Sequence, residues 1–306
     1  KKNKNVCSFQ QRELIVNSLK KSGYSKLEKN VYHHSKVNYD DRLYVDNFGF
    51  QWNIFQKTQF DSQTLLPLTE SRLKVCSEWD LEKLSGKLVL ELGSGAGRFT
   101  EIFLKYGAIV VSLELSSAIY SNAKNNRNEN LFAIRESIID FKLNDLLFDY
   151  VFCYGVTQHL PNPEAAYFKS CEYLKPDSGK LTIDHYLRRL DEKIPLFIYN
   201  SKYLWRIITK RININILYKV LKKIIYISLP FDILLKKIFS KKLYKIVKLI
   251  IPLPIANYYG EEHIYQSFEN LYIFCLLDTF DRLSARYDEP WTKERLTKFS
   301  KKLPLS

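Results

Sequence analysis

The sequence predicts an α/β fold in which a mostly parallel sheet has helices on both faces. Between residues 71 and 189, short apolar segments alternate with segments of helical periodicity. Within this region a glycine-rich turn joins an apolar strand to a helix, KLVLELGSGAGRFT at residues 87–100. The chain of 306 residues, 46% of them hydrophobic, can bury one core of ordinary size and carry an appendage.

Residues 1–70 are expected to form an N-terminal extension of this fold. Up to residue 45 they are polar, with one amphipathic helix predicted over 11–20. His33 and His34 are adjacent, which does not suit chelation from one face of a helix or strand, so we expect them on the surface or in a loop. Residues 47–60, NFGFQWNIFQKTQF, place five aromatic side chains around one glycine. This segment is predicted to clamp onto the domain or, alternatively, to form a lid over its ligand site.

The predicted core, residues 71–189, begins with a helix over 71–84 and a strand over 88–92. The glycines that follow alternate as G-x-G-x-G, and a dinucleotide fingerprint would need a third glycine where Arg98 stands. Glycine lets a ligand approach the main chain, and the start of a helix attracts negative ligand groups. Glu91 at the strand end would repel a pyrophosphate and attract a sulfonium or an α-amino group.

A second carboxylate follows the second strand, which is predicted over 108–113. Glu114 lies 21 residues beyond Gly93, about the separation at which the next strand of a nucleotide-binding βαβ unit presents an acid to ribose hydroxyls. Its two oxygens can accept from two cis hydroxyls at once. A helix over 117–126, a third strand over 131–134 and a buried fourth strand over 148–154 complete this half of the core.

Three blocks of the chain carry a family resemblance. The glycine turn with Glu91 resembles the first motif of the class I S-adenosylmethionine-dependent methyltransferases. GVTQHLPNPEAA at 155–166 resembles the family pattern G-V-L-x-H-x-x-D-P-x-x-A, and KPDSGKLTI at 175–183 resembles the turn L-K-P-G-G into a fifth strand. With NFGFQW and the tail LLDTFDRLSARY at 276–287, the resemblance covers about residues 46–300 and extends to bacterial members associated with cell-surface polysaccharide or other glycan pathways.

The resemblance implies a Rossmann-like class I methyltransferase fold with a seven-stranded, mostly parallel sheet. It also implies S-adenosyl-L-methionine as cofactor and S-adenosyl-L-homocysteine as product. Ser137 stands where the family usually has an acidic residue near the adenine, and Ile138 is expected to pack against the ring. The cofactor-binding residues that we expect are Glu91, Gly93, Ser94, Gly95, Gly97, Arg98, Glu114, Leu115, Ser137, Ile138, Tyr154 and Gly155.

His159 is the candidate for chemistry, because an imidazole near the transferred methyl group could accept a proton from a hydroxyl. The alternative is that it caps or packs beside the proline-rich turn, and methyl transfer needs mainly in-line positioning. The candidate acceptor contacts are Trp52, Gln158, Asp278, Arg286 and Tyr287. In the tail, pairing of arginine with aspartate could instead hold the segment onto the sheet.

Residues 190–260 are predicted to form a basic amphipathic helical insertion. Residues 202–254 contain thirteen lysine or arginine residues and one acidic residue, a net charge of +12. The first interpretation is a cap over the acceptor cleft, and the second adds contact with an anionic membrane through 202–254. Nucleic acid is the least favoured partner, because no binding module is recognisable. Residues 261–306 are expected to complete the sheet on the acceptor side.

The functional hypothesis is O-methylation of a sugar or glycan-lipid acceptor in cell-surface polysaccharide biosynthesis. The alternatives are methylation of a lipid or quinone headgroup at the membrane, and a cofactor-binding scaffold without catalysis. Five scattered cysteines without metal-ligand spacing favour a reducing cytoplasm and no metal site. We therefore expect a cytoplasmic protein, with attachment to the inner face of the membrane as an alternative. The acceptor itself is not readable from the sequence.

Overall fold

The computed structural model describes residues 2–27, 30–35, 45–56, 58–196, 200, 202–240, 242–244, 247, 255 and 267–304. The chain divides into two compact units. Unit 1 comprises Lys1–Leu187 and Tyr287–Ser306, and unit 2 comprises Arg188–Arg286. The predicted core and its N-terminal extension both lie in unit 1, whereas the predicted basic insertion falls in unit 2.

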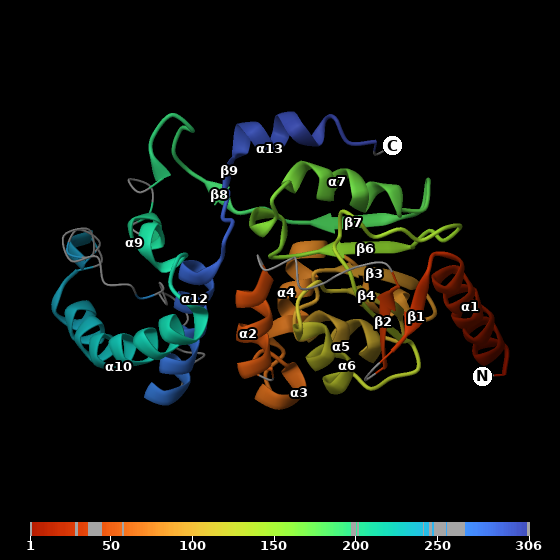
Figure 1. Ribbon diagram of the computed structural model, residues 1–306, viewed down its shortest axis with the longest axis horizontal. Helices are drawn as coiled ribbons and strands as arrows, with labels where there is room; N and C mark the ends of the chain where they lie inside the picture. Colours follow the sequence, from red (N-terminus) through yellow and green to blue (C-terminus); the bar gives the residue numbers. More distant parts are fainter. Residues whose placement is uncertain are drawn as a thin grey trace. The chain divides into compact units, whose positions relative to one another are not determined.

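Unit 1 is built on a seven-stranded sheet in the order β1-β2-β5-β4-β3-β6-β7 (Figure 1). Its strands are β1 (Tyr24–Lys26), β2 (Val31–His34), β3 (Leu88–Leu92), β4 (Ile109–Leu113), β5 (Leu131–Arg135), β6 (Tyr150–Cys153) and β7 (Lys180–Ile183). The β1–β2 pair is antiparallel and every other pair is parallel. The predicted α/β fold with a mostly parallel, seven-stranded sheet is confirmed.

Helices pack against both faces of this sheet (Figure 1). The helical segments of unit 1 are α1 (Lys2–Lys21), α2 (Asp46–Ile54), α3 (Asp61–Thr64), α4 (Leu68–Ser77), η4 (Leu81–Leu84), α5 (Arg98–Lys105), α6 (Ala118–Asn125), η5 (Thr157–His159), α7 (Pro163–Glu172) and α13 (Lys293–Ser300). The α7 helix begins as the sequence predicts, with Pro163 in its first turn and the Asn162 side chain accepting from the Ala165 amide.

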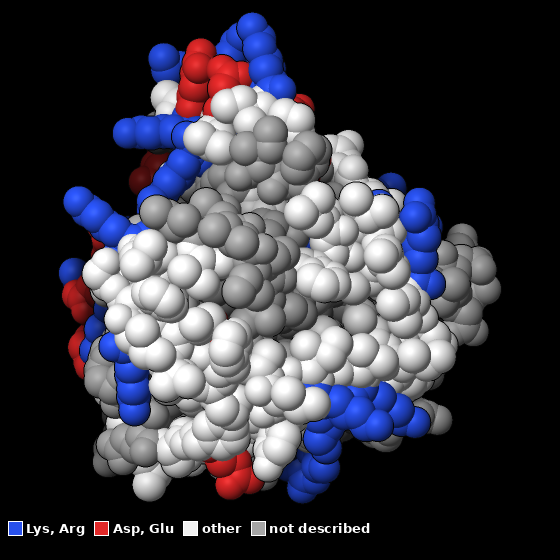
Figure 2. All heavy atoms as spheres, turned by 90° about the vertical axis from the view of Figure 1, so that its left-hand side faces the viewer, with Lys and Arg blue, Asp and Glu red and all other residues white. Residues whose placement is uncertain are grey.

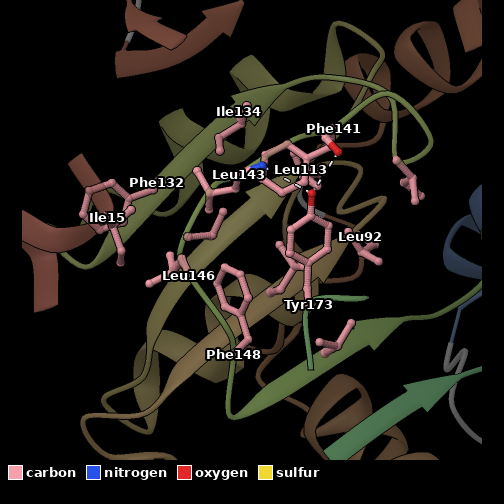
Figure 3. Close-up of a cluster of buried hydrophobic side chains, with 14 of the residues drawn as sticks. Ile15, Leu92, Leu113, Phe132, Ile134, Phe141, Leu143, Leu146, Phe148 and Tyr173 are labelled. Atoms are coloured by element: carbon pink, nitrogen blue, oxygen red, sulfur yellow. Dashed lines mark hydrogen bonds between the residues drawn. The ribbon is translucent and has the colours of Figure 1, made fainter. Parts of the chain in front are cut away.

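The two faces of the sheet have separate hydrophobic cores. Along β3, Leu88, Leu90 and Leu92 enter one core and Val89 enters the other, as the period-2 alternation of a strand requires. Figure 3 shows the first core, where the Tyr173 hydroxyl donates to the Phe141 carbonyl at 2.9 Å. All five residues of β3 and of β4 are buried. Buried packing along both strands therefore fixes the position of their carboxyl ends.

The N-terminal extension, not the C-terminal segment, completes the sheet. β2 pairs with β5, and in β2 His33 is only 8% exposed and lies 3.2 Å from the Tyr120 hydroxyl. The prediction of a surface or loop position for His33 was therefore wrong, because the parallel edge of β5 recruits this segment. Within the described part of 261–306, Trp291 belongs to a two-residue strand, β9 (Trp291–Thr292), outside the seven-stranded sheet, and packs on Tyr167.

Three helices make up most of the described part of unit 2, and two of them lie in the predicted basic insertion. After β8 (Leu187–Arg188), which straddles the unit boundary, these helices are α9 (Lys202–Thr209), α10 (Ile214–Ile238) and α12 (Phe268–Ser284). Both α9 and α10 pack on α12, so the unit runs to residue 286 and not to the predicted boundary at 260. Among the described residues, no helix is long and apolar enough to cross a membrane.

Candidate cofactor and acceptor site

The turn between β3 and α5 has a backbone that only glycine suits. Gly95 and Gly97 have φ angles of 55° and 93°, in the left-handed region. A Cβ on Gly95 would lie 3.1 Å from the Trp52 indole nitrogen, and one on Gly97 would lie 2.2 Å from the Asn122 side-chain oxygen. A side chain at Gly95 would therefore meet Trp52 of α2, which lies over the turn, and a side chain at Gly97 would meet Asn122 of α6.

Glu114, at the carboxyl end of β4, places its carboxylate on the glycine turn. One oxygen accepts from the Gly95 amide at 3.0 Å and the other accepts from the Ser116 amide at 2.8 Å. Each oxygen keeps a lone pair for a further donor. Glu114 therefore lies at the turn, where two backbone amides hold its carboxylate in place. A contact with ribose hydroxyls stays a prediction.

Glu91 lies in a buried network behind the turn. Its carboxylate accepts from the Thr100 hydroxyl at 2.5 Å and from the Ser112 hydroxyl at 3.2 Å. The Asn122 amide joins this network by donating to Ser94, Thr100 and Ser112 at 2.9–3.0 Å. Burial raises the pKa of Glu91 to about 7, although the two hydroxyl donors oppose the rise. A cofactor contact by Glu91 stays a prediction, and the observed bonds tie β3 to α5 and β4.

Arg98, the residue that replaces a third glycine, turns toward the segment before α3. Its guanidinium donates to the Gln59 side chain at 2.7 Å. Burial and the neighbouring Arg72 lower the pKa of Arg98 to about 10, so it remains charged at neutral pH.

The carbonyl of Leu115, another predicted cofactor contact, accepts from Arg135 at 3.2 Å, which fixes the loop after β4.

The loop after β5 holds an acid that the sequence reasoning did not select. Glu136 is 2% exposed and its carboxylate accepts from the Ser137 amide at 2.8 Å. Ser137 and Ile138 are both 6% exposed, and Ile138 belongs to the hydrophobic core. Alignment of the strand with the family pattern places the family's acidic residue at Ser137, one position after Glu136. The position of Glu136 directly after the strand was the signal that could have identified it. Glu136 joins Ser137 and Ile138 as a candidate for the adenine site.

A second cluster lies at the carboxyl ends of β6 and β7. Gly155, which follows the partly buried Tyr154, has a φ of 75°, and its amide donates to the Asp184 carboxylate at 2.6 Å. Burial raises the pKa of Asp184 to about 6, whereas this amide and nearby His159 favour the charged form. Asp184 was not selected from the sequence, although it directly follows a predicted strand and lies beside the strand end that carries Tyr154 and Gly155.

His159 is held in one tautomer. Its Nδ1 lies 3.0 Å from the carbonyl oxygen of Tyr287, which can only accept, so Nδ1 carries the hydrogen and Nε2 has the lone pair. The ring packs against Phe48 and Tyr186, with centroids 5.1 and 5.5 Å away. Tyr287 therefore contacts His159 through its backbone carbonyl. The sequence predicted instead a contact between Tyr287 and the acceptor, and that contact stays a prediction.

Two buried glutamines, Gln51 and Gln158, have side-chain amides without a hydrogen-bond partner among the described residues. Gln51 is 1% exposed and Gln158 is fully buried. Gln51 lies one turn after Phe48 on α2, and Gln158 directly precedes His159. A buried amide without a partner is costly, so a ligand or water that pairs with these groups is expected. Gln51 is a site residue that the sequence reasoning missed.

The remaining predicted acceptor contacts lie in unit 2. Asp278 forms an ion pair with Arg282, one turn along α12, at 2.9 Å. Arg286 is exposed at the end of the unit. This ion pair lies within one helix, so it is not the pairing of arginine with aspartate that would hold the tail onto the sheet. A role for Asp278 or Arg286 in acceptor binding stays a prediction.

Comparison with known proteins is consistent with this arrangement. Residues 90–182, from β3 to β7, match the model of a family described as a methyltransferase domain. Proteins named ubiquinone biosynthesis O-methyltransferase are similar over part of their length. The protein from Coxiella burnetii is 26% identical over 133 residues, which cover 42% of this chain and 55% of that protein. The one from Haemophilus ducreyi is 29% identical over 135 residues, which cover 42% and 56%.

The chain thus spans little more than half the length of these curated relatives. Among solved structures, the N-methyltransferase NodS from Bradyrhizobium japonicum, in complex with S-adenosyl-L-homocysteine, is 20% identical. That similarity covers 35% of this chain and 55% of NodS, with a TM-score of 0.32.

Proposed function

We propose that this chain is a methyltransferase that uses S-adenosyl-L-methionine. The observation that carries the proposal is the Glu114 carboxylate, bonded to the Gly95 amide inside the segment that matches methyltransferase domains. The residues present suit the cofactor: a carboxylate for two ribose hydroxyls, a glycine turn that a Cβ would obstruct, and the buried Glu136 beside Ile138 for the adenine. When bound, S-adenosyl-L-methionine supplies a methyl group activated by its sulfonium sulfur.

His159 would accept the proton that an acceptor hydroxyl loses as its oxygen is methylated. Its Nε2 has the lone pair, because the Tyr287 carbonyl holds the hydrogen on Nδ1. Phe48 and Tyr186 limit the rotation of the ring. The buried carboxylate of Asp184 would stabilise the imidazolium that forms, since the two groups interact electrostatically.

The acceptor that we propose first is a hydroxyl group of a sugar or glycan-lipid, by the resemblance to glycan-associated methyltransferases. The amides of Gln51 and Gln158 suit hydroxyl groups, because an amide can donate to one oxygen and accept from another. A quinone headgroup is the second candidate. It is favoured by the curated relatives, which are named ubiquinone biosynthesis O-methyltransferases.

Isothermal titration with S-adenosyl-L-methionine and S-adenosyl-L-homocysteine tests the cofactor assignment. We expect saturable binding of both, abolished in Gly95→Val, because a valine at this left-handed position would meet Trp52 and distort the turn. Binding should be about tenfold weaker in Glu114→Ala. Val75→Ala, on the exposed face of α4, is the control. Absence of binding heat with both compounds would reject the proposal.

Radiolabelled S-adenosyl-L-methionine then identifies the acceptor class. The full chain is incubated with separate glycan, glycolipid and quinone-precursor fractions, and label in each fraction is counted. Transfer to glycan or glycolipid supports the first candidate, and transfer to the quinone precursor supports the second. Cofactor binding without label in any fraction would leave the non-catalytic scaffold as the better interpretation.

A further inference from the structure

The long helix of unit 2 presents two apolar stripes, of which one is buried and the other is exposed among the described residues. Leu217, Leu221, Ile225 and Leu229 are 0–2% exposed and form the buried stripe. This side of α10 packs on α12, where Tyr218 meets Phe280 edge-on at 5.8 Å. One buried stripe is enough to hold an amphipathic helix in a helical unit, so the second stripe is not needed for this packing.

The second stripe runs along the exposed side of the same helix. Its members are three or four residues apart and therefore share one face. They are Ile216 (56% exposed), Val220 (43%), Ile224 (37%), Ile227 (75%), Phe231 (46%), Leu234 (51%) and Ile238 (62%). From the first to the last the stripe is about 33 Å long, at 1.5 Å per residue. A continuous exposed apolar surface of this length indicates an interaction site.

Positive charge borders this stripe on the side away from the buried face. Lys219, Lys223 and Lys237 are exposed, and each lies three residues after a member of the stripe. Within residues 202–244 the one acidic residue is Asp232, which is fully buried and accepts from the Tyr244 hydroxyl at 2.9 Å. In Figure 2, uncharged side chains fill most of the visible surface, with lysine and arginine mainly toward its margins.

We propose that the exposed stripe of α10 docks on the surface of an anionic lipid bilayer. The apolar side chains would enter the boundary between headgroups and acyl chains, with the helix axis in the plane of the membrane. The bordering lysines would then lie at the level of the anionic headgroups. A second copy of this face is a poorer partner, because an isologous contact would bring lysine rows together with no exposed acid on α10 to compensate. The proposal does not depend on methyl transfer.

Flotation of the full chain with vesicles tests the proposal. The vesicles contain phosphatidylcholine alone or an equimolar mixture with phosphatidylglycerol, at about 0.1 M and about 1 M salt, where the screening length falls from about 10 Å to about 3 Å. We expect association with the anionic vesicles at low salt, strongly reduced at high salt and on neutral vesicles. Equal association with neutral and anionic vesicles would overturn the proposal.

Two sets of variants separate the apolar and the charged contributions. Ile227→Ser with Phe231→Ser should lower the association constant about tenfold or more, because two exposed apolar side chains are lost. Lys219→Gln with Lys223→Gln should remove the preference for anionic vesicles. Val75→Ser, which changes an 80% exposed side chain on α4, should leave association unchanged.

Circular dichroism and S-adenosyl-L-methionine affinity verify that each variant is folded, and the affinity should be unchanged in all of them. Undiminished association of the Ile227→Ser, Phe231→Ser variant would overturn the proposal. It would also be overturned if sedimentation velocity shows a dimer that this variant dissociates while the parent protein does not bind vesicles. In that case a second copy, and not lipid, covers the stripe.

Discussion

At the scale of single residues, the base role that we propose for His159 depends on a backbone carbonyl 128 positions away. Because Tyr287 holds the hydrogen on Nδ1, Nε2 is the only ring nitrogen that can take a proton. We expect His159→Gln to lower kcat about 10²- to 10⁴-fold while the dissociation constant of S-adenosyl-L-methionine stays the same. Steady-state kinetics with the identified acceptor measure this effect.

The control for this prediction is Phe48→Leu, which removes a ring contact to His159 but no proton acceptor. Its kcat should fall much less than that of His159→Gln. A fall in kcat of less than about tenfold in His159→Gln would mean that positioning of the reactants suffices and that no base is used.

Glu91 makes the stability of unit 1 depend on pH. Its pKa rises on folding from 4.5 to about 7, so the folded state binds the proton more tightly than the unfolded state. The stabilisation is complete below about pH 4.5 and is lost as pH rises through 7, an effect on the order of 3 kcal/mol. The pKa of Asp184 is likewise raised on folding, from 3.8 to about 6. Its contribution to stability is therefore complete below about pH 3.8 and is lost as pH rises through about 6.

The variant Glu91→Gln keeps an acceptor for the Thr100 hydroxyl and removes the titration. Its free energy of unfolding, from urea denaturation at several pH values, should fall less between pH 4.5 and 7 than that of the parent protein. Above pH 7 the variant should be the more stable of the two. An unchanged pH dependence would show that Glu91 does not titrate in this range.

At the scale of secondary-structure elements, α2 is held against α6 by close packing and by polar contacts. A Cβ on Gly49 would lie 2.7 Å from the Ser117 hydroxyl, and Asn53 bonds to Ser117 and Ser121 at 2.9 and 2.7 Å. Since Trp52 lies between these positions on α2 and covers Gly95, displacement of the helix would uncover the glycine turn. The predicted clamp and lid functions can therefore belong to the same helix.

We expect Gly49→Val to push α2 away from α6 and to weaken S-adenosyl-L-methionine binding about tenfold, as measured by titration calorimetry. The melting temperature should change little, because the two hydrophobic cores are not altered. The control is Ile54→Val, at a 43% exposed position of the same helix. Full affinity in Gly49→Val would mean that α2 does not contribute to the cofactor site.

At the scale of the whole molecule, the candidate cofactor residues all belong to unit 1. If the units unfold separately, calorimetry should show two transitions, of which S-adenosyl-L-methionine raises only one. At a cofactor concentration of about 100 times the dissociation constant, the expected shift is about 5–10 °C. Equal shifts of both transitions would show that unit 2 also binds the cofactor or unfolds together with unit 1.

The parts of the site that were predictable depend on local sequence. An apolar strand, alternating glycines and an acid at the next strand end are separated by short distances along the chain, and parallel strands bring their carboxyl ends to one edge. This is why Glu114 lies at the glycine turn, where it accepts from the Gly95 amide. The helices and strands between residues 88 and 183 follow from the same local periodicity.

Other features required contacts between distant segments. The amphipathic pattern could not show that β2 would pair with β5 and bury His33, because an unpaired sheet edge is a property of the assembled fold. It also could not show that Gln51 would be buried without a partner. The sequence by itself determined the strands β3 to β7, the glycine turn and its carboxylate. The tertiary structure decided the tautomer of His159, the cover over the turn and the exposed stripe of α10, because each depends on which distant surfaces pack together and which remain uncovered.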